Sequence, residues 1–333
     1  MLYTLYFTSE IMLPICFAFV LNLLLQPGMR WFGKLRVPRI VAALLMIASF
    51  LGSLGALGFA LSGPAAEWIA KAPVTLQLLE QRLLVFKKPV EDMQKASKQV
   101  ERIATDAATD VNLVTIKGPG LSSFLFSGTR TLVTGVLTAV ALLFFLLVSG
   151  DLFLRRLVEI LPTLSDKKRA VDISREIESN ISGYLVTISL MNAGVGIATG
   201  IAAYLCGLAD PILWGSVAFL LNYIPILGPL IGGGVLFLAG VSAFETLWQA
   251  ILPAAIYLVI HVIESQSVTP LLHARRLTLN PVLVIMALVF WYWMWGIGGT
   301  LLAVPLLATA KIVFDRITSL AALGHFLGAE ARV

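Results

Sequence analysis

Long apolar runs are the feature that most restricts what this chain can fold into. Several runs reach or approach the roughly 20 residues that a helix needs to span the hydrocarbon core of a bilayer. Examples are Ile40 to Leu61, Leu132 to Val148 and Gly183 to Leu205. Of the 333 residues, 58% are hydrophobic and only 13% are charged, about half the charged share of a soluble domain. The sequence therefore predicts an all-α, polytopic membrane protein.

Changes in composition divide the chain into six segments. We expect N-terminal membrane helices in 1–62, an extracytoplasmic amphipathic helical segment in 63–120, a membrane helix in 121–149, a cytoplasmic amphipathic helix in 150–182, a transport core with two broken-helix hairpins in 183–316 and a cytoplasmic tail in 317–333.

Basic residues predict the orientation. The joint between the first two apolar segments, "PGMRWFGKLRVPR", carries four basic residues and no acid, and 150–182 carries a second basic group that includes Arg155 and Arg175. Short basic loops stay on the cytoplasmic side of a membrane. The basic residues are not interleaved with aromatic ones in a stripe, so we expect no nucleic-acid partner.

Residues 64–120 are polar, with apolar or small residues at the alternating three-four spacing of a coiled-coil seam. Pro89 is predicted to begin a second helix there. Two interpretations stay open at this point. The segment is either an amphipathic pair lying on the bilayer surface or a surface for helix–helix or subunit contact.

The region 183–316 contains a repeat. Asp210–Pro211 and Asn280–Pro281 lie seventy positions apart, and each pair opens an apolar helix. The first helix breaks at "IPILGP" and the second at "GIGG", with Gly228 aligned on Gly298. A helix from Pro211 to Tyr223 would reach about 20 Å, less than the hydrocarbon core of about 30 Å.

Each unit is therefore predicted to be a helical hairpin that enters the membrane and turns back; the alternative is a pair of proline-kinked spanning helices. Paired interrupted segments are a known sequence sign of a transport site. Connections around Asp210 and Glu245 lack Lys and Arg, whereas Arg275 and Arg276 lie between the units. The two hairpins should then enter from opposite sides, as an inverted repeat of re-entrant hairpins.

Three stretches carry a family resemblance: "LNYIPILGPLIGG", "IESQSVTPLLHARRLTLNP" and "WGIGGTLLAVPLLATAK". They resemble the autoinducer-2 exporter (AI-2E) family of bacterial membrane proteins. The resemblance implies secondary export of small polar molecules across the inner (cytoplasmic) membrane, with an elevator-like moving unit in a homo-oligomer. It also implies that the Pro-x-x-Gly-Pro and Gly-x-x-Gly regions form the hairpin tips. Those tip residues here are Pro225, Gly228, Pro229, Gly296, Gly298 and Gly299.

Polar residues near the first break complete the candidate site. Asn222 and Tyr223 lie beside the tip, and Asn192 lies in a Gly-rich helix expected to face it, two residues before the segment "GVGIATG". Gly196 and Gly200 in that segment should let helices approach closely. Glu264 and Gln266 end an apolar run, with His261 one turn earlier. An acid within a membrane is usually functional, but both residues could equally end a helix at the interface, and His261 could be a ligand or a packing residue.

The sequence contains no motif for ATP-driven transport or for hydrolase chemistry. The sequence has no nucleotide-binding P-loop and no His-Glu-x-x-His or Gly-x-Ser-x-Gly, so we expect no enzyme, cofactor or metal centre. The leading hypothesis is a secondary exporter of a small polar solute, driven by a proton or sodium gradient or by the solute's own gradient. The alternatives are a sodium/proton antiporter and a non-transporting membrane scaffold organised by 64–120.

Overall fold

The computed structural model describes residues 8–101, 121–150, 152–274, 279–317 and 320–328. In this part of the chain, five helices are long and apolar enough to cross a membrane, and a pair bent by 70°, 133–149 with 154–160, is a sixth candidate. No strand is present there beyond an isolated bridge between Leu279 and Gly328. The prediction of an all-α polytopic membrane protein is confirmed.

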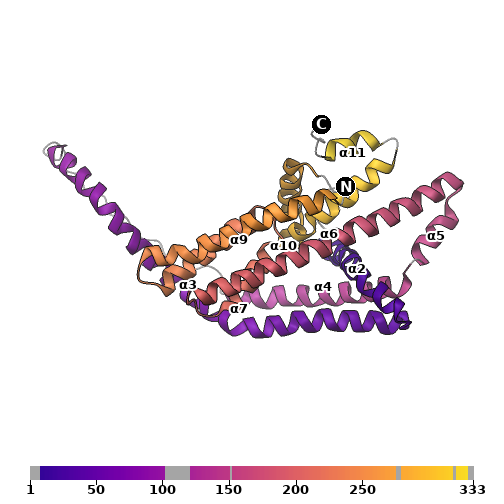
Figure 1. Cartoon of the computed structure of the whole chain (residues 1–333), viewed down its shortest axis with the longest axis horizontal. Helices are drawn as coiled ribbons and strands as arrows, with labels where there is room; N and C mark the ends of the chain where they lie inside the picture. Colours follow the sequence, from indigo (N-terminus) through magenta and orange to yellow (C-terminus); the bar gives the residue numbers. More distant parts are fainter. Residues whose placement is uncertain (1–7, 102–120, 151, 275–278, 318–319, 329–333) are drawn as a thin grey trace.

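The helices run mainly along the longest dimension of the molecule (Figure 1). They are α2 Ser9–Lys34, α3 Arg39–Glu101, α4 Leu121–Ser149, α5 Leu152–Ile160, α6 Leu164–Leu205, α7 Pro211–Leu221, α8 Leu227–Ala243, α9 Leu247–Ala274, α10 Pro281–Arg316 and α11 Ala321–Leu327.

Two helices continue through positions where the composition predicted a boundary. The helix α3 runs through 62/63 and through Pro89, so the prediction that a second helix begins at Pro89 is wrong. Proline removes one backbone hydrogen bond and can kink a helix without ending it. The helix α6 runs through 182/183 for 42 residues, about 60 Å. Most of the seam predicted in 64–120 lies outside the residues whose side chains are described.

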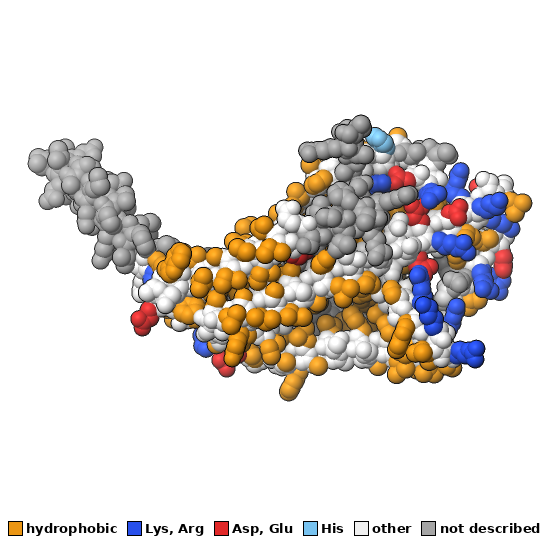
Figure 2. Space-filling view, in the orientation of Figure 1, with side chains coloured by type: hydrophobic (Ala, Val, Ile, Leu, Met, Phe, Trp, Pro, Cys, Tyr) orange, Lys and Arg blue, Asp and Glu red, His pale blue; other side chains and the backbone are white. Residues whose placement is uncertain are grey.

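The basic segments predicted to be cytoplasmic lie at one end of the molecule, which we call the basic end. Figure 2 shows Lys and Arg gathered there, beside α5 and the N-terminal half of α6. An ion pair between Arg30 and Glu178 joins α2 to α6. A second pair, with 2.6 Å between Arg316 Nη2 and Glu176 Oε2, joins the end of α10 to α6.

The opposite end, called here the outer end, is where α7 begins and α8 finishes. From Arg39 at the basic end, α3 reaches Arg82, whose Nη1 donates to the carbonyl oxygen of Phe244 at 2.7 Å. Earlier in α3, the ring of Trp68 packs edge-on against Trp214 of α7, 4.8 Å between centroids. The two free ends of the α7–α8 pair, the start of α7 and the end of α8, therefore lie at the outer end.

Small residues bring α6 and α7 together. A Cβ added to Gly196 would lie 2.8 Å from the carbonyl oxygen of Gly215, and one added to Gly215 would lie 2.6 Å from that of Gly196. Gly200 approaches the carbonyl oxygen of Pro211 in the same way, at 3.3 Å. The prediction that Gly196 and Gly200 permit a close helix approach is confirmed.

The chain turns back at both breaks in the repeat. A Cβ on Gly228 would collide with the carbonyl oxygen of Leu221, and one on Gly299 with that of Trp291. Residues seven or eight apart in an unbroken helix are about 10 to 12 Å apart along its axis. Both contacts thus require a reversal, which occurs between α7 and α8 and, inside α10, at Trp295 and Gly296, where the φ/ψ angles are not helical.

The two ends of α10 lie at the basic end. The backbone N–H of Asn280 donates to the carbonyl oxygen of Leu327 at 3.2 Å, so α11 packs beside the start of α10. The same short helix touches the last turns of α10, since a Cβ on Gly324 would collide with Asp315 and one on Gly328 would lie 3.4 Å from the side chain of Lys311. The start and the end of α10 therefore lie close together, beside α11.

Cysteine labelling should distinguish the two ends. In a cysteine-free background, Glu245→Cys at the outer end should react with an impermeant maleimide on intact cells. Lys168→Cys and Asp315→Cys, at the basic end, should react only after permeabilisation, because basic segments remain cytoplasmic. Labelling of all three positions from the same side would contradict this orientation.

A glycine pair within α8 tests the turn. Gly228→Ala should lower the unfolding temperature, because the new Cβ collides with backbone, and overpacking costs about 1–3 kcal/mol. Gly234→Ala is the matched control: nothing lies within 4 Å of its added Cβ, and alanine favours the helix, so stability should be unchanged or higher. Tryptophan fluorescence during heating in detergent measures both; equal behaviour would contradict the close contact.

Candidate functional site

The first break, between α7 and α8, is held by short turns. Asn222 ends α7, the N–H of Ile224 donates to the carbonyl oxygen of Leu221 at 2.9 Å, and the N–H of Gly228 donates to that of Ile224 at 2.9 Å. Ile226 has φ +67°, which is a strained value for a β-branched residue. Sparsely populated backbone conformations persist where the surrounding structure enforces them, often at binding sites.

Two asparagines join the break to α6. The Asn222 side-chain amide donates from Nδ2 to Oδ1 of Asn192 at 2.9 Å. Both residues are buried, with 8% and 0% of their surface exposed. The Nδ2 group of Asn192 is buried and has no partner. An amide donor left unpaired in an apolar setting costs about 1–3 kcal/mol, so this N–H group is suited to donate a hydrogen bond to an oxygen of a bound molecule.

The helix α9 adds ionisable groups to the same place. The Glu264 carboxylate faces the side-chain amide of Asn222, and Nδ1 of His261 lies 3.3 Å from Oε2 of Glu264. The two atoms are within ion-pair distance, but their geometry does not make a hydrogen bond. Two turns before Glu264, the buried hydroxyl of Tyr257 lies against Gly232 and has no partner. Asn192, Asn222, Tyr257, His261 and Glu264 are called the polar cluster below.

The other predicted residues of the first tip surround this cluster. Tyr223 donates its hydroxyl to Ser189 of α6 at 2.8 Å. Gly228 and Pro229 are buried at the start of α8, and Pro225 is half-buried in the turn. These residues shape the break, and their contacts are structural.

The structure does not bring Gln266 or the second break into the polar cluster. Gln266 is exposed, two residues beyond Glu264. Gly296 supplies a positive φ of +62° at the second break, and a Cβ on Gly298 would lie 3.2–3.3 Å from Leu13 and Phe17 of α2. The surroundings of this break are apolar, with Met294, Trp295 and Leu302 packed against α2. It is Gly299, and not the aligned Gly298, that matches the contact of Gly228.

Sequence reasoning missed two members of this arrangement, Ser189 and Tyr257. A signal existed for both. Tyr257, His261 and Glu264 follow the i, i+4, i+7 spacing of one helix face, and Ser189 precedes Asn192 by three residues. Counting ionisable residues alone directed attention to Glu264 and away from the uncharged members of its face.

The composition of the cluster limits its chemistry. Among the described residues, no group of three or more His, Cys, Asp or Glu could hold a metal ion. The polar cluster offers amide and hydroxyl hydrogen-bond partners and one carboxylate beside an imidazole. Such a set can bind a hydroxylated or carbonyl-containing solute, and it can hold a proton or a small cation.

Comparison with known proteins gives the wider context. The AI-2E family transporter pattern matches residues 1–319. The AI-2 transport protein TqsA of Escherichia coli (strain K12) is 27% identical over 320 residues, which cover 93% of this chain and 87% of TqsA. YhhT of the same strain is 26% identical, covering 96% and 87% of the two chains, and YueF of Bacillus subtilis (strain 168) is 25% identical, covering 94% and 86%. The names of these last two assign transport provisionally. With nearly its whole length matched, the chain belongs to the AI-2E family of transporters.

Proposed function

We propose that this multi-pass membrane protein exports a small polar solute of the AI-2 kind across the bacterial inner membrane as a secondary transporter. The observation that carries the proposal is the unpaired, fully buried amide of Asn192 beside the broken helix at Asn222. The AI-2E family and the name of TqsA support transport and this solute class, and point to a transporter rather than an enzyme.

The broken helices support a transport mechanism built on two re-entrant hairpins. The helix α7 has 11 residues and α8 has 17, about 16 and 26 Å, so each is shorter than the hydrocarbon core. The α7–α8 pair opens at the outer end and α10 opens at the basic end. Opposite openings are what an inverted repeat requires, and broken backbone at membrane depth is typical of transporter binding sites.

Close packing through glycine supports an elevator-like movement. At the Gly196–Gly215 contact the two helices meet backbone to backbone, and a smooth glycine face of this kind would suit sliding. We propose that α7 and α8 belong to the moving unit. A homo-oligomer, with 63–120 as a subunit contact, would provide the fixed frame against which such a unit moves.

A second candidate function is sodium/proton antiport. It is favoured by Glu264, which has a side chain only 12% exposed and lies against Asn222 with His261 beside it. A buried carboxylate of this kind can alternate between a proton and a cation. A non-transporting scaffold, the third hypothesis from the sequence, is not proposed, because the relatives are named as transport proteins.

Reconstitution in liposomes tests the proposal. The purified chain should move AI-2 down an imposed solute gradient, and proton and sodium gradients applied one at a time identify the coupling ion. Transport of AI-2 that needs no ion gradient supports a uniporter-like exporter. Proton movement driven by a sodium gradient, with no movement of AI-2, would contradict the exporter proposal and support the antiporter.

Replacement of the carboxylate separates the two candidates. Glu264→Gln keeps the shape and the hydrogen-bonding capacity toward Asn222 but cannot alternately bind a proton and a cation. An antiporter that uses this group should lose ion coupling completely, while a solute exporter should retain most of its AI-2 flux. Sodium-driven proton flux and AI-2 flux in the same liposomes give the comparison. Glu159→Gln, which alters an exposed acid of α5, is the control and should change neither.

Loss of the Asn222 amide tests the binding role of the cluster. Asn222→Leu leaves the Asn192 side chain without its partner and removes a hydrogen-bonding group, so the KM for AI-2 should rise about five- to hundredfold, as expected for 1–3 kcal/mol. Tyr223→Phe is the neighbouring control, because its hydroxyl bonds to Ser189 outside the cluster. A KM unchanged in Asn222→Leu, in protein that elutes as a single species, would show that the solute binds elsewhere.

A further inference from the structure

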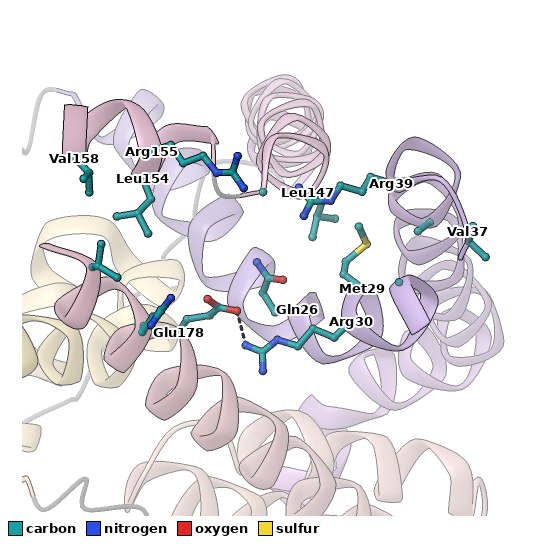
Figure 3. A pocket seen from close by; sticks show the side chains of 15 residues that line it. Gln26, Met29, Arg30, Val37, Arg39, Leu147, Leu154, Arg155, Val158 and Glu178 are labelled. Carbon is teal, nitrogen blue, oxygen red and sulfur yellow. Dashed lines mark hydrogen bonds and ion pairs between the residues drawn. The ribbon is translucent and has the colours of Figure 1, made fainter. Parts of the chain in front are cut away.

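A cavity of about 630 Å³ lies at the basic end, apart from the polar cluster. Its walls come from the C-terminal part of α2, the start of α3, the end of α4, α5 and the N-terminal half of α6. Figure 3 shows the side chains of these elements arranged around the opening. The volume is that of a small-molecule binding site, and no part of the proposed transport mechanism uses it.

The charge of the lining is strongly unbalanced. Four arginines, Arg30, Arg39, Arg155 and Arg175, face one carboxylate, Glu178. Glu178 pairs with Arg30 (Figure 3), and the other three arginines form no ion pair within the described residues. Asp151 is outside those residues, so the excess of positive charge stated here refers to the described lining.

Two of the arginines extend into the cavity from different sides. In Figure 3, Arg39 and Arg155 come from different helices and their guanidinium groups turn toward each other. Arg39 lies directly over Gly150, where an added Cβ would collide with its Nη1. Gly150 has φ +49°, a conformation that favours glycine. The missing side chain at Gly150 thus leaves room for the Arg39 guanidinium in the cavity wall, where a bound anion would stabilise it.

Apart from Gln26, the rest of the lining is apolar or glycine and includes Met29, Leu147, Leu154 and Val158. A free inorganic anion would make no favourable contact with this apolar wall. A phospholipid carries both a phosphate for the arginines and acyl chains for the apolar side chains. Guanidinium groups bind phosphate through paired hydrogen bonds. Basic pockets between membrane helices on the cytoplasmic side bind anionic headgroups. We infer that this cavity binds the headgroup of an anionic phospholipid from the cytoplasmic leaflet, where it links α2 and α5 to α6.

Neighbouring arginines of α5 provide the test. Arg155 lines the cavity, whereas Arg156 is outside it, with 80% of its side chain exposed and its Nη1 3.2 Å from Glu159. Native mass spectrometry of the full chain in detergent would measure binding of dioctanoyl phosphatidylglycerol, dioctanoyl phosphatidylcholine and inorganic phosphate. We expect Arg155→Gln and Arg39→Gln to weaken phosphatidylglycerol binding about tenfold each, and Arg156→Gln to leave it unchanged.

The arms of this experiment separate the sources of phosphate. Preference for phosphatidylglycerol over phosphatidylcholine, lost in Arg155→Gln and Arg39→Gln, supports the inference. Equal binding of the two lipids, equal effects of Arg155→Gln and Arg156→Gln, or inorganic phosphate binding as tightly as the lipid would each overturn it. As a second readout, vesicles of phosphatidylcholine with phosphatidylglycerol should raise the unfolding temperature of the wild-type chain above its value in phosphatidylcholine alone. They should do so much less for Arg155→Gln.

Discussion

The absence of water from the hydrocarbon core is the constraint on which the rest of this structure depends. Every backbone N–H and C=O at that depth needs a partner within the protein, which explains both the long helices and the way in which they are broken. At the first break, short turn hydrogen bonds replace part of the lost helical bonding, and the buried Asn222 side chain bonds to the side chain of Asn192 in α6. At the second, the chain reverses with apolar side chains of α2 packed around it. The same rule therefore allows a break beside polar side chains at one place and a break packed mainly by apolar side chains at another.

This difference suggests separate roles for two units that the sequence relates by a repeat. The polar cluster collects its groups from α6, from the end of α7 and from α9, so it can respond to a solute or an ion. At the second break, a glycine turn packs against Leu13 and Phe17, and the Thr300 hydroxyl donates to the carbonyl oxygen of Gly296 at 3.2 Å. In a transporter of the AI-2E family, such a division would place recognition on one hairpin and mechanical support on the other.

Sequence patterns predicted the parts of this fold that depend on local composition. Apolar run length identified the membrane helices, and the prolines and glycines of "IPILGP" identified a break with Asn222 beside it. Patterns failed where three-dimensional packing decides the outcome. The helix α3 continues through Pro89, because a proline removes one backbone hydrogen bond without necessarily ending a helix. The repeat aligned Gly298 with Gly228, but it is Gly299 that makes the corresponding backbone contact. The geometry of the turn decides which residue does so, and the spacing of the repeat cannot predict it to a single residue.

The unpaired hydroxyl of Tyr257 has an evolutionary consequence. A buried hydroxyl without a partner adds nothing to folding and costs on the order of 1 kcal/mol, so phenylalanine at this position would make the protein at least as stable. Random drift under selection for folding alone would therefore erase the tyrosine over time. Its persistence or loss across related chains is a record of whether ligand binding, and not stability, has governed this face of α9.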